Sequence, residues 1–198
     1  MRLISVGLLL LLVFPARPVS ACEIPPELLA NRTFTENQKI LEGEVLFVAD
    51  ARLHDFEGRT AAVSGLVMAR GLQDAVGCVA IDARGLETGI ALRNKFMWED
   101  HLEVTKFPEI RFVLTGLADV QTEAENIGLT LEGELFLHGV ARDVRIPAKL
   151  TPGDGRTKVE GRTKLRMSDY GIARPAFLFI TVKDEVEVRF RVLMGEAE

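Results

Sequence analysis

The sequence is poor in the residues that most catalytic and metal sites require. Its 198 residues include two cysteines, three histidines, one tryptophan and one tyrosine. Two cysteines cannot form a disulfide framework or a four-thiolate zinc site, and the three histidines show no metal-ligand spacing. We therefore expect no metal and no cofactor, and we expect that the protein is not an enzyme.

Basic residues are also scarce. Lys and Arg total 24 against 29 Asp and Glu, which gives a net charge of −5. A phosphate backbone would be repelled by this charge, and the few large aromatic residues give no platform for stacking bases. The sequence therefore predicts no nucleic-acid partner.

Long apolar runs are confined to the N-terminus. The twelve uncharged residues from Leu3 to Phe14 follow Arg2 and precede small residues at 19–21. This length suits the apolar region of a signal peptide and is too short to span a bilayer. We expect residues 1–21 to be a signal peptide and 22–40 a linker, so that the mature chain is exported.

Cys22 has two alternative fates. The segment 19–22, VSAC, resembles a bacterial lipobox, in which Cys22 would carry lipid and attach an outer-membrane lipoprotein to the membrane. Pro15, Arg17 and Pro18, however, separate it from the apolar run. Cleavage after Ala21 would instead leave a periplasmic or secreted protein whose Cys22 could pair with Cys78 in an oxidising compartment.

Most of the remaining sequence alternates between apolar and polar residues. From Glu185 to Val192, four charged and four apolar side chains alternate without a fault, which predicts a half-buried strand. Comparable patterns make about eight strands at fairly even spacing, as in a sandwich or a barrel. The other segments are Val45–Ala51, Val63–Ala69, Cys78–Ala83, Ile110–Leu117, Ile127–Leu137, Val144–Leu150 and Thr157–Arg166.

Two interruptions bear on how such strands would close. The pair Glu-Gly occurs at 42–43, 57–58, 132–133 and 160–161. These glycines either allow the bends of a barrel or lie in turns. Between Leu92 and Val104 the alternation gives way to a loosely helical pattern. We expect this single helix to pack across one barrel end and to leave the other end as the entrance.

Three blocks of sequence carry a family resemblance. GIALRNKFMWEDHLEVTKFPEIRF, at 89–112, resembles the YceI-like family motif, T-G-x-x-x-R-[DN]-x-x-M followed by a short helix and K-[FY]-P-x-I-x-F. LFLHGV at 135–140 and SDYGI at 168–172 resemble two later blocks of that family, in the same order and at the same spacing. We assign residues 41–195 to a YceI-like domain. Asn94 stands where the family commonly has Asp.

The resemblance implies a fold and a function. The fold is all-β, an extended, lipocalin-like antiparallel barrel of eight strands with one short helical insert. Such a protein would sequester or carry an isoprenoid lipid or quinone-type amphiphile in an apolar cavity, and eight strands are wide enough to hold one small ligand.

Two alternatives remain open. One is an envelope scaffold or interaction domain with a filled core, and the other is a His-dependent hydrolase that uses His54 or His138. The chain could also form a homodimer.

Residues from three strands are expected to line the cavity and residues of the helical insert to close or border it, with Trp98 as the expected aromatic contact. The predicted lining residues are Phe96, Met97, Trp98, Ile127, Leu129, Leu131, Val144, Ile146, Val186, Val188 and Phe190.

Overall fold

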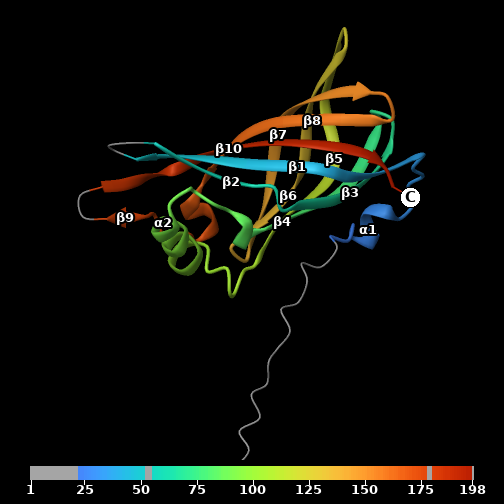
Figure 1. Ribbon diagram of the computed structural model, residues 1–198. Coiled ribbons are helices and arrows are strands. Elements are labelled where there is room, and N and C mark those ends of the chain that lie inside the picture. The colour runs from blue at the N-terminus through green and yellow to red at the C-terminus, as the bar shows by residue number, and fades with distance from the viewer. Residues whose placement is uncertain (1–21, 52–54, 178–179, 198) are drawn as a thin grey trace, which may run out of the picture.

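A computed structural model of the chain describes residues 22–51, 55–177 and 180–197. The predicted signal peptide and His54 lie outside these residues. Figure 1 shows the arrangement of the elements. In chain order they are α1 (Pro26–Leu29), β1 (Glu36–Ala51), β2 (Phe56–Thr60), β3 (Val63–Arg70), β4 (Asp74–Asp82), η1 (Ala83–Gly85), α2 (Ala91–Phe96), η2 (Met97–His101), β5 (Glu109–Glu123), β6 (Asn126–Leu137), β7 (Val140–Gly153), β8 (Arg156–Arg166), η3 (Met167–Tyr170), β9 (Ala176–Phe177) and β10 (Ile180–Glu196).

The strands form a closed antiparallel barrel. From β3 to β8, each strand pairs with the next in sequence, and β10 follows β8. The ring closes because β1 pairs with β3 along one edge and with β10 along the other, from Gln38 to Ala51. The short strands β2 and β9 extend this barrel by pairing with β1 and β10. The predicted eight-stranded barrel with one short helical insert is therefore confirmed.

The helices lie at the two ends of the barrel. α2 and η2 occupy the segment predicted to be helical, beside β2 and β9, whereas α1 lies at the other end near the C-terminus (Figure 1). Among the described residues, no helix has the length and apolar character required to cross a bilayer.

A bulge in β1 reverses which of its residues face inward. The pairing with β10 shifts between Ile40 and Glu42, so Leu41 is an extra residue, and it is 41% exposed. Ile40 lines the interior before the bulge, and Val45 and Phe47 line it afterwards. Because strand side chains alternate with a period of two, one extra residue keeps the apolar side chains of both halves on the inner face.

The wall is incompletely paired between β7 and β8, and we call this stretch the seam. Ala148 pairs with Gly161 and the ladder continues to the hairpin turn, but no described pair joins 140–147 to 162–166. Pro147 lies where the ladder ends and has no N–H to donate. The helical turn η3 covers the inner side of the seam, where the Tyr170 side chain is buried, and this burial raises the pKa of Tyr170.

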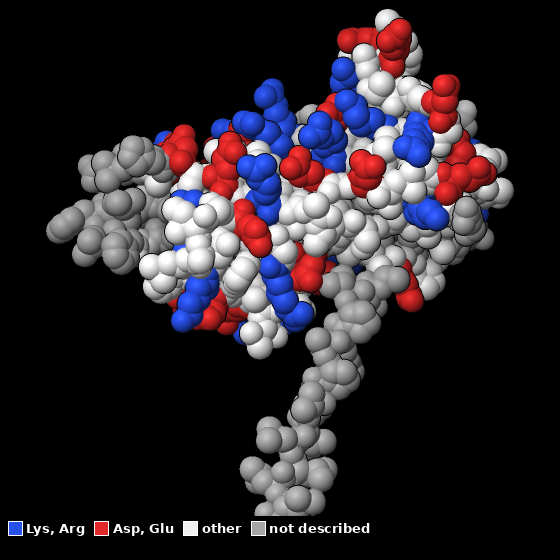
Figure 2. Space-filling model, in the orientation of Figure 1, with Lys and Arg blue, Asp and Glu red and all other residues white. Residues whose placement is uncertain are grey.

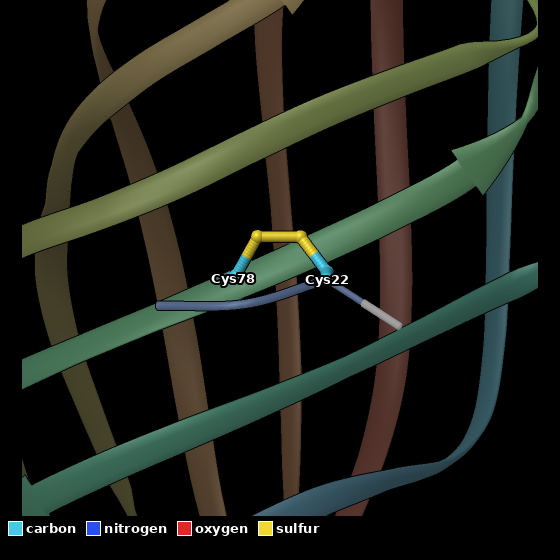
Figure 3. The surroundings of a disulfide bond; sticks show 2 residues. All are labelled: Cys22 and Cys78. Atoms are coloured by element: carbon cyan, nitrogen blue, oxygen red, sulfur yellow. A yellow bond between two sulfur atoms is a disulfide. The ribbon is translucent and has the colours of Figure 1, made fainter. Parts of the chain in front are cut away.

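Residues 22–35, the first part of the predicted linker, pack against the outside of the barrel. Ile24 is buried against Val76, Cys78 and Val113, which point outward from β4 and β5. A disulfide joins Cys22 to Cys78, with the two Cα atoms 5.4 Å apart (Figure 3). We call residues 22–35 the N-terminal clasp. The clasp covers an apolar outer surface of β4 and β5 that would otherwise be exposed to water.

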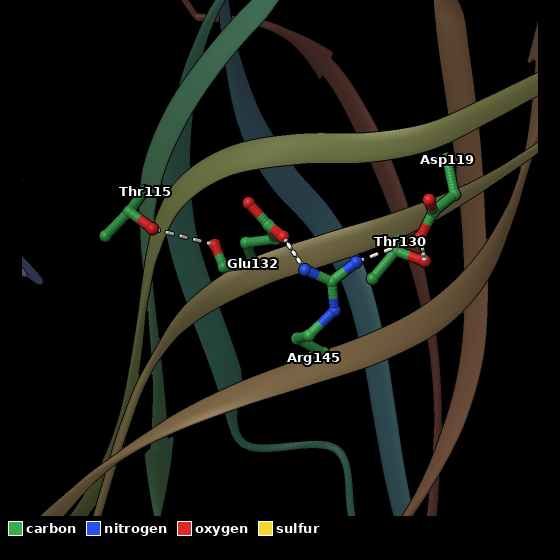
Figure 4. A network of polar contacts seen from close by, with 5 residues as sticks. All are labelled: Thr115, Asp119, Thr130, Glu132 and Arg145. Atoms are coloured by element: carbon green, nitrogen blue, oxygen red, sulfur yellow. Dashed lines mark hydrogen bonds and ion pairs between the residues drawn. The ribbon is translucent and has the colours of Figure 1, made fainter.

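The remaining outer face is charged. Acidic and basic side chains of both signs are interspersed over the face seen in Figure 2. One group of them spans β5, β6 and β7, where Arg145 contacts both Glu132 and Asp119 and Thr130 Oγ1 donates to Asp119 Oδ2 at 2.9 Å (Figure 4). In the same group, Thr115 Oγ1 donates to the Glu132 carbonyl at 3.1 Å. These contacts tie together the part of β5 that carries two register shifts.

The disulfide should contribute measurably to stability. It closes a loop with a sequence separation of 56 residues. The chain-entropy argument gives a loss of about 4 kcal/mol in the free energy of unfolding for the C22S/C78S double variant. Guanidinium denaturation measures this loss. Reducing agent should destabilise the wild type by a similar amount and leave the double variant unchanged; equal stability of oxidised wild type and variant would contradict the prediction.

Candidate functional site

The interior of the barrel holds a cavity of about 1290 Å³. It is lined along β1 from Glu36 to Ala51, a strand of 16 residues and therefore about 50 Å long. Its volume exceeds the ~300–1,000 Å³ typical of small-molecule pockets. Val, Leu, Ile, Phe, Met and Ala make up most of its lining. The cavity can therefore enclose a long hydrocarbon chain but has few groups along its length that could orient a polar one.

Three phenylalanine rings of the lining lie against glycines. The rings are Phe47, Phe112 and Phe190. A Cβ placed on Gly58 would lie 2.2 Å from the ring of Phe47, and one placed on Gly161 would lie 2.6 Å from that of Phe190. These glycines lie within strands, so the alternative that they lie in turns is wrong for them. Each leaves room for a large ring beside the wall, so the ring takes up less of the cavity.

Phe190 also faces a second hollow outside the barrel. A groove of about 810 Å³ runs over β7, β8, β10 and β1, and its lining includes Pro147, Gly161 and Phe190. Phe190 is therefore shared by the cavity and the outer groove, at the point where the seam begins.

Eight of the eleven predicted lining residues do line the cavity. The other three of the eleven are absent from its described lining, and they are Ile127, Val144 and Trp98. Ile127 has the same parity as its neighbours but lies at the hairpin end of β6, and Val144 packs beneath Tyr170 and η3. The eight are Phe96, Met97, Leu129, Leu131, Ile146, Val186, Val188 and Phe190.

Trp98 is the aromatic residue that the sequence predicts to contact the ligand, and in the structure its indole hydrogen-bonds to the protein itself. Its Nε1–H donates to the Leu86 carbonyl at 2.9 Å, which ties η2 to the loop after η1. The aromatic part of the described lining instead includes Phe47, Phe56 and Phe112. The alternation of Val45, Phe47 and Ala49 in the sequence could have identified Phe47 as a lining residue.

Polar lining groups gather at the two ends of the cavity. Glu36, Gln38 and Thr157 lie at the end where β1 begins. Arg93, Asp100, His101 and Arg166 lie at the end covered by α2. Exposed apolar side chains border this second end, with Ile90 54%, Leu92 63% and Phe96 47% exposed. The α2 end thus combines the charged groups with an apolar rim.

Arg93 is held by a network of hydrogen bonds within the α2 segment. Its Nε donates to Thr88 Oγ1 at 2.8 Å and its Nη2 to the Thr88 carbonyl at 2.6 Å. Thr88 is fixed in turn by Asn94, whose Oδ1 accepts from the Thr88 amide and hydroxyl at 2.8 and 2.7 Å. The guanidinium carbon lies 4.6 Å from the centroid of the Phe56 ring. An amide oxygen at Asn94 therefore fills the position where the family commonly has a carboxylate.

The other polar side chains that could take part in chemistry make contacts within the protein. His138 contacts the Tyr170 carbonyl through Nδ1 at 3.0 Å and Glu103 through Nε2 at 2.8 Å, and His101 Nδ1 contacts the Ala173 carbonyl. Ser168 donates through both N–H and Oγ to Asp184, and these hydrogen bonds lower the pKa of Asp184. In the part of the chain that the structure describes, no cluster of three His, Cys, Asp or Glu residues could hold a metal ion.

Comparison with known sequences gives a family and several relatives. The YceI-like domain matches residues 41–194. A UPF0312 protein of Shewanella denitrificans is 30% identical over 128 residues, which are 61% of this chain and 62% of that protein. A UPF0312 protein of Enterobacter sp. strain 638 is 33% identical over 101 residues, 48% of this chain and 50% of the relative. The chain thus matches less than two thirds of the length of these relatives.

Comparison with solved structures shows the same fold. BcnA of Burkholderia cenocepacia superposes with a TM-score of 0.65 at 18% identity, over 76% of this chain and 95% of BcnA. A polyisoprenoid binding domain from Saccharophagus degradans gives a TM-score of 0.64 at 17% identity, over 81% of this chain and 98% of that domain.

The glycines beneath the rings should tolerate no methyl group. We expect G58A and G161A each to lower the free energy of unfolding by about 1–3 kcal/mol, because the new Cβ pushes a ring out of its position. Gly116 is the control, since a Cβ there meets no atom within 4 Å. Urea denaturation should show G116A unchanged or stabilised by up to about 1 kcal/mol. Equal effects at all three positions would contradict this explanation.

Proposed function

This chain belongs to the YceI-like domain family, and we propose that it is an exported protein that sequesters or carries an isoprenoid lipid or quinone-type amphiphile in its barrel cavity. The observation that carries the proposal is the hollow interior of about 1290 Å³ with its apolar lining. In a scaffold domain with a filled core, side chains would meet across the middle of the barrel. The cavity is evidence against that alternative.

A hydrocarbon guest needs nothing from such a cavity except burial. Removing a CH₂ group from water is worth about 0.8 kcal/mol. At the lower efficiency of drug-sized ligands, ~0.3 kcal/mol per heavy atom, a chain of ~40 carbons would gain ~12 kcal/mol, which corresponds to roughly nanomolar affinity. Binding of this strength requires no metal and no catalytic group. The hydrolase alternative would need a nucleophile and base, and the polar contacts of His138 and Ser168 given above are contacts within the framework.

Export is the second part of the proposal. It is supported by the apolar N-terminal sequence and by the disulfide between Cys22 and Cys78, because disulfides persist in oxidising compartments such as the periplasm. A thioether-linked lipid would need the same Cys22 sulfur, so lipidation and this disulfide exclude each other. We propose the disulfide form, in which the lipobox resemblance has no function. Assembly into a homodimer stays a prediction.

The intact mass of the mature protein separates these two forms. We expect a chain that begins at Cys22, carries no acyl mass and gains the mass of two hydrogens on reduction. An added diacylglyceryl mass would instead establish the lipoprotein.

Extraction of the purified protein with organic solvent tests the bound ligand. We expect mass spectrometry to find an isoprenoid amphiphile in wild-type protein. Protein that emerges empty, and that takes up no isoprenoid when offered one, would exclude the carrier function.

Filling the cavity should block uptake. V188W and L131W each place an indole among inward-facing residues, and we expect at least a tenfold loss of isoprenoid uptake together with an overpacking cost of ~1–3 kcal/mol. The control is R189W, which places the same side chain on the outer face of the same strand, next to Val188. Fluorescence titration with a prenyl probe measures the effect, and uptake that is equal in all three variants would contradict the assigned cavity.

A further inference from the structure

Arg93 is a fixed cation at one end of a cavity whose lining is mostly apolar. It belongs to α2, lines the cavity and is half-buried. Its Nε and Nη2 are committed to Thr88, and its guanidinium stacks on Phe56. Nη1 has no hydrogen-bond partner among the described residues. The contacts therefore fix the plane of the guanidinium and leave part of its donor edge for another group.

The network beneath Arg93 is suited to hold it in one orientation. Asn94 is only 8% exposed, and its Oδ1 accepts both hydrogen bonds from Thr88. Thr88 thereby presents its hydroxyl lone pair and its carbonyl to Arg93. A guanidinium oriented in advance loses less conformational entropy when it binds a carboxylate or phosphate than a free side chain does.

Arg93 also has no ion-pair partner among the residues that the structure describes. No carboxylate of the described residues lies within the 4.0 Å ion-pair distance of it, and it is absent from the ten ion pairs found. At the same end, Asp100 and Arg166 both line the cavity and are both exposed, so their opposite charges balance. Glu36 places a carboxylate at the opposite end. The described lining therefore carries a net positive charge at the α2 end and a negative charge at the opposite end.

From this arrangement, and resting on the proposed function, we infer that the ligand carries an anionic head group, a phosphate or a carboxylate, which Arg93 binds at the α2 end. The hydrocarbon tail then extends along the cavity toward Glu36. An ionised oxygen acceptor forms stronger hydrogen bonds with a guanidinium than a neutral one does. The reverse orientation would place the anion beside Glu36, where like charges repel.

Three probes with one tail test the inference: farnesyl phosphate, farnesoic acid and farnesol, titrated calorimetrically into the wild-type protein below their micelle concentrations. We expect at least one of the two anions to bind about tenfold more tightly than the alcohol. Whichever anion binds more tightly identifies the head group as phosphate or carboxylate. The preference should fall as salt is raised, because part of this site is exposed to solvent.

Variants assign the preference to Arg93. R93Q should bind farnesol within about twofold of wild type and lose the preference for the anion. R93K should keep part of the preference for the anion, and this variant provides the test if R93Q does not fold. K95Q is the matched control, since Lys95 is an exposed cation on the same helix, and this variant should behave as wild type.

The outcomes separate this inference from the proposed function. If farnesol and both anions bind wild type equally, or if R93Q retains the full preference, the head-group site is wrong while the cavity proposal stands. If none of the three probes binds, the proposed function itself fails.

Discussion

The pairing of the first and last strands is the constraint on which the rest of the structure depends. β1 and β10 lie at opposite ends of the sequence, yet they pair from Gln38 to Ala51 and turn an open sheet into a ring. Closure removes two sheet edges and gives every strand an inner and an outer face. The bulge at Leu41 lets one long strand satisfy this closure while its apolar residues remain inside. Without that ring there would be no enclosed space for a hydrocarbon to occupy.

Two features of the lining determine the width and the polarity of the cavity. Glycines opposite Phe47 and Phe190 let large rings lie close to the wall, so aromatic lining does not fill the cavity. Charged groups of the lining lie near its ends, where Arg93 at one end and Glu36 at the other carry opposite charges. The middle of the cavity therefore offers mostly apolar contacts, and the charged groups lie near its ends. On the outside, the N-terminal clasp covers an apolar outer surface of β4 and β5 by a covalent and hydrophobic contact.

Much of this was predictable from the sequence, and the failures have physical causes. Alternation with a period of two predicted the strands and the inward parity of residues such as Leu131 and Val188, since a half-buried strand has that pattern in any barrel. It could not predict that Trp98 turns to a carbonyl or that η3 covers Val144, because these depend on contacts between segments distant in sequence. The fixed orientation of Arg93 was missed for the same reason. Its hydrogen bonds become evident only once the loop before α2 has folded.

The seam between β7 and β8 gives the barrel an uneven stiffness. Between β6 and β7 and between β8 and β10 the wall is held by long backbone ladders whose register is costly to change, whereas from Pro147 toward η3 it is held by side-chain packing and by a hydrogen bond from Arg142 to the Asp169 carbonyl. Such packing yields more readily than a ladder. Next to Phe190 the barrel therefore has fewer backbone hydrogen bonds that oppose a local widening than along these two ladders, so a thick or branched tail would meet the less stiff part of the wall there.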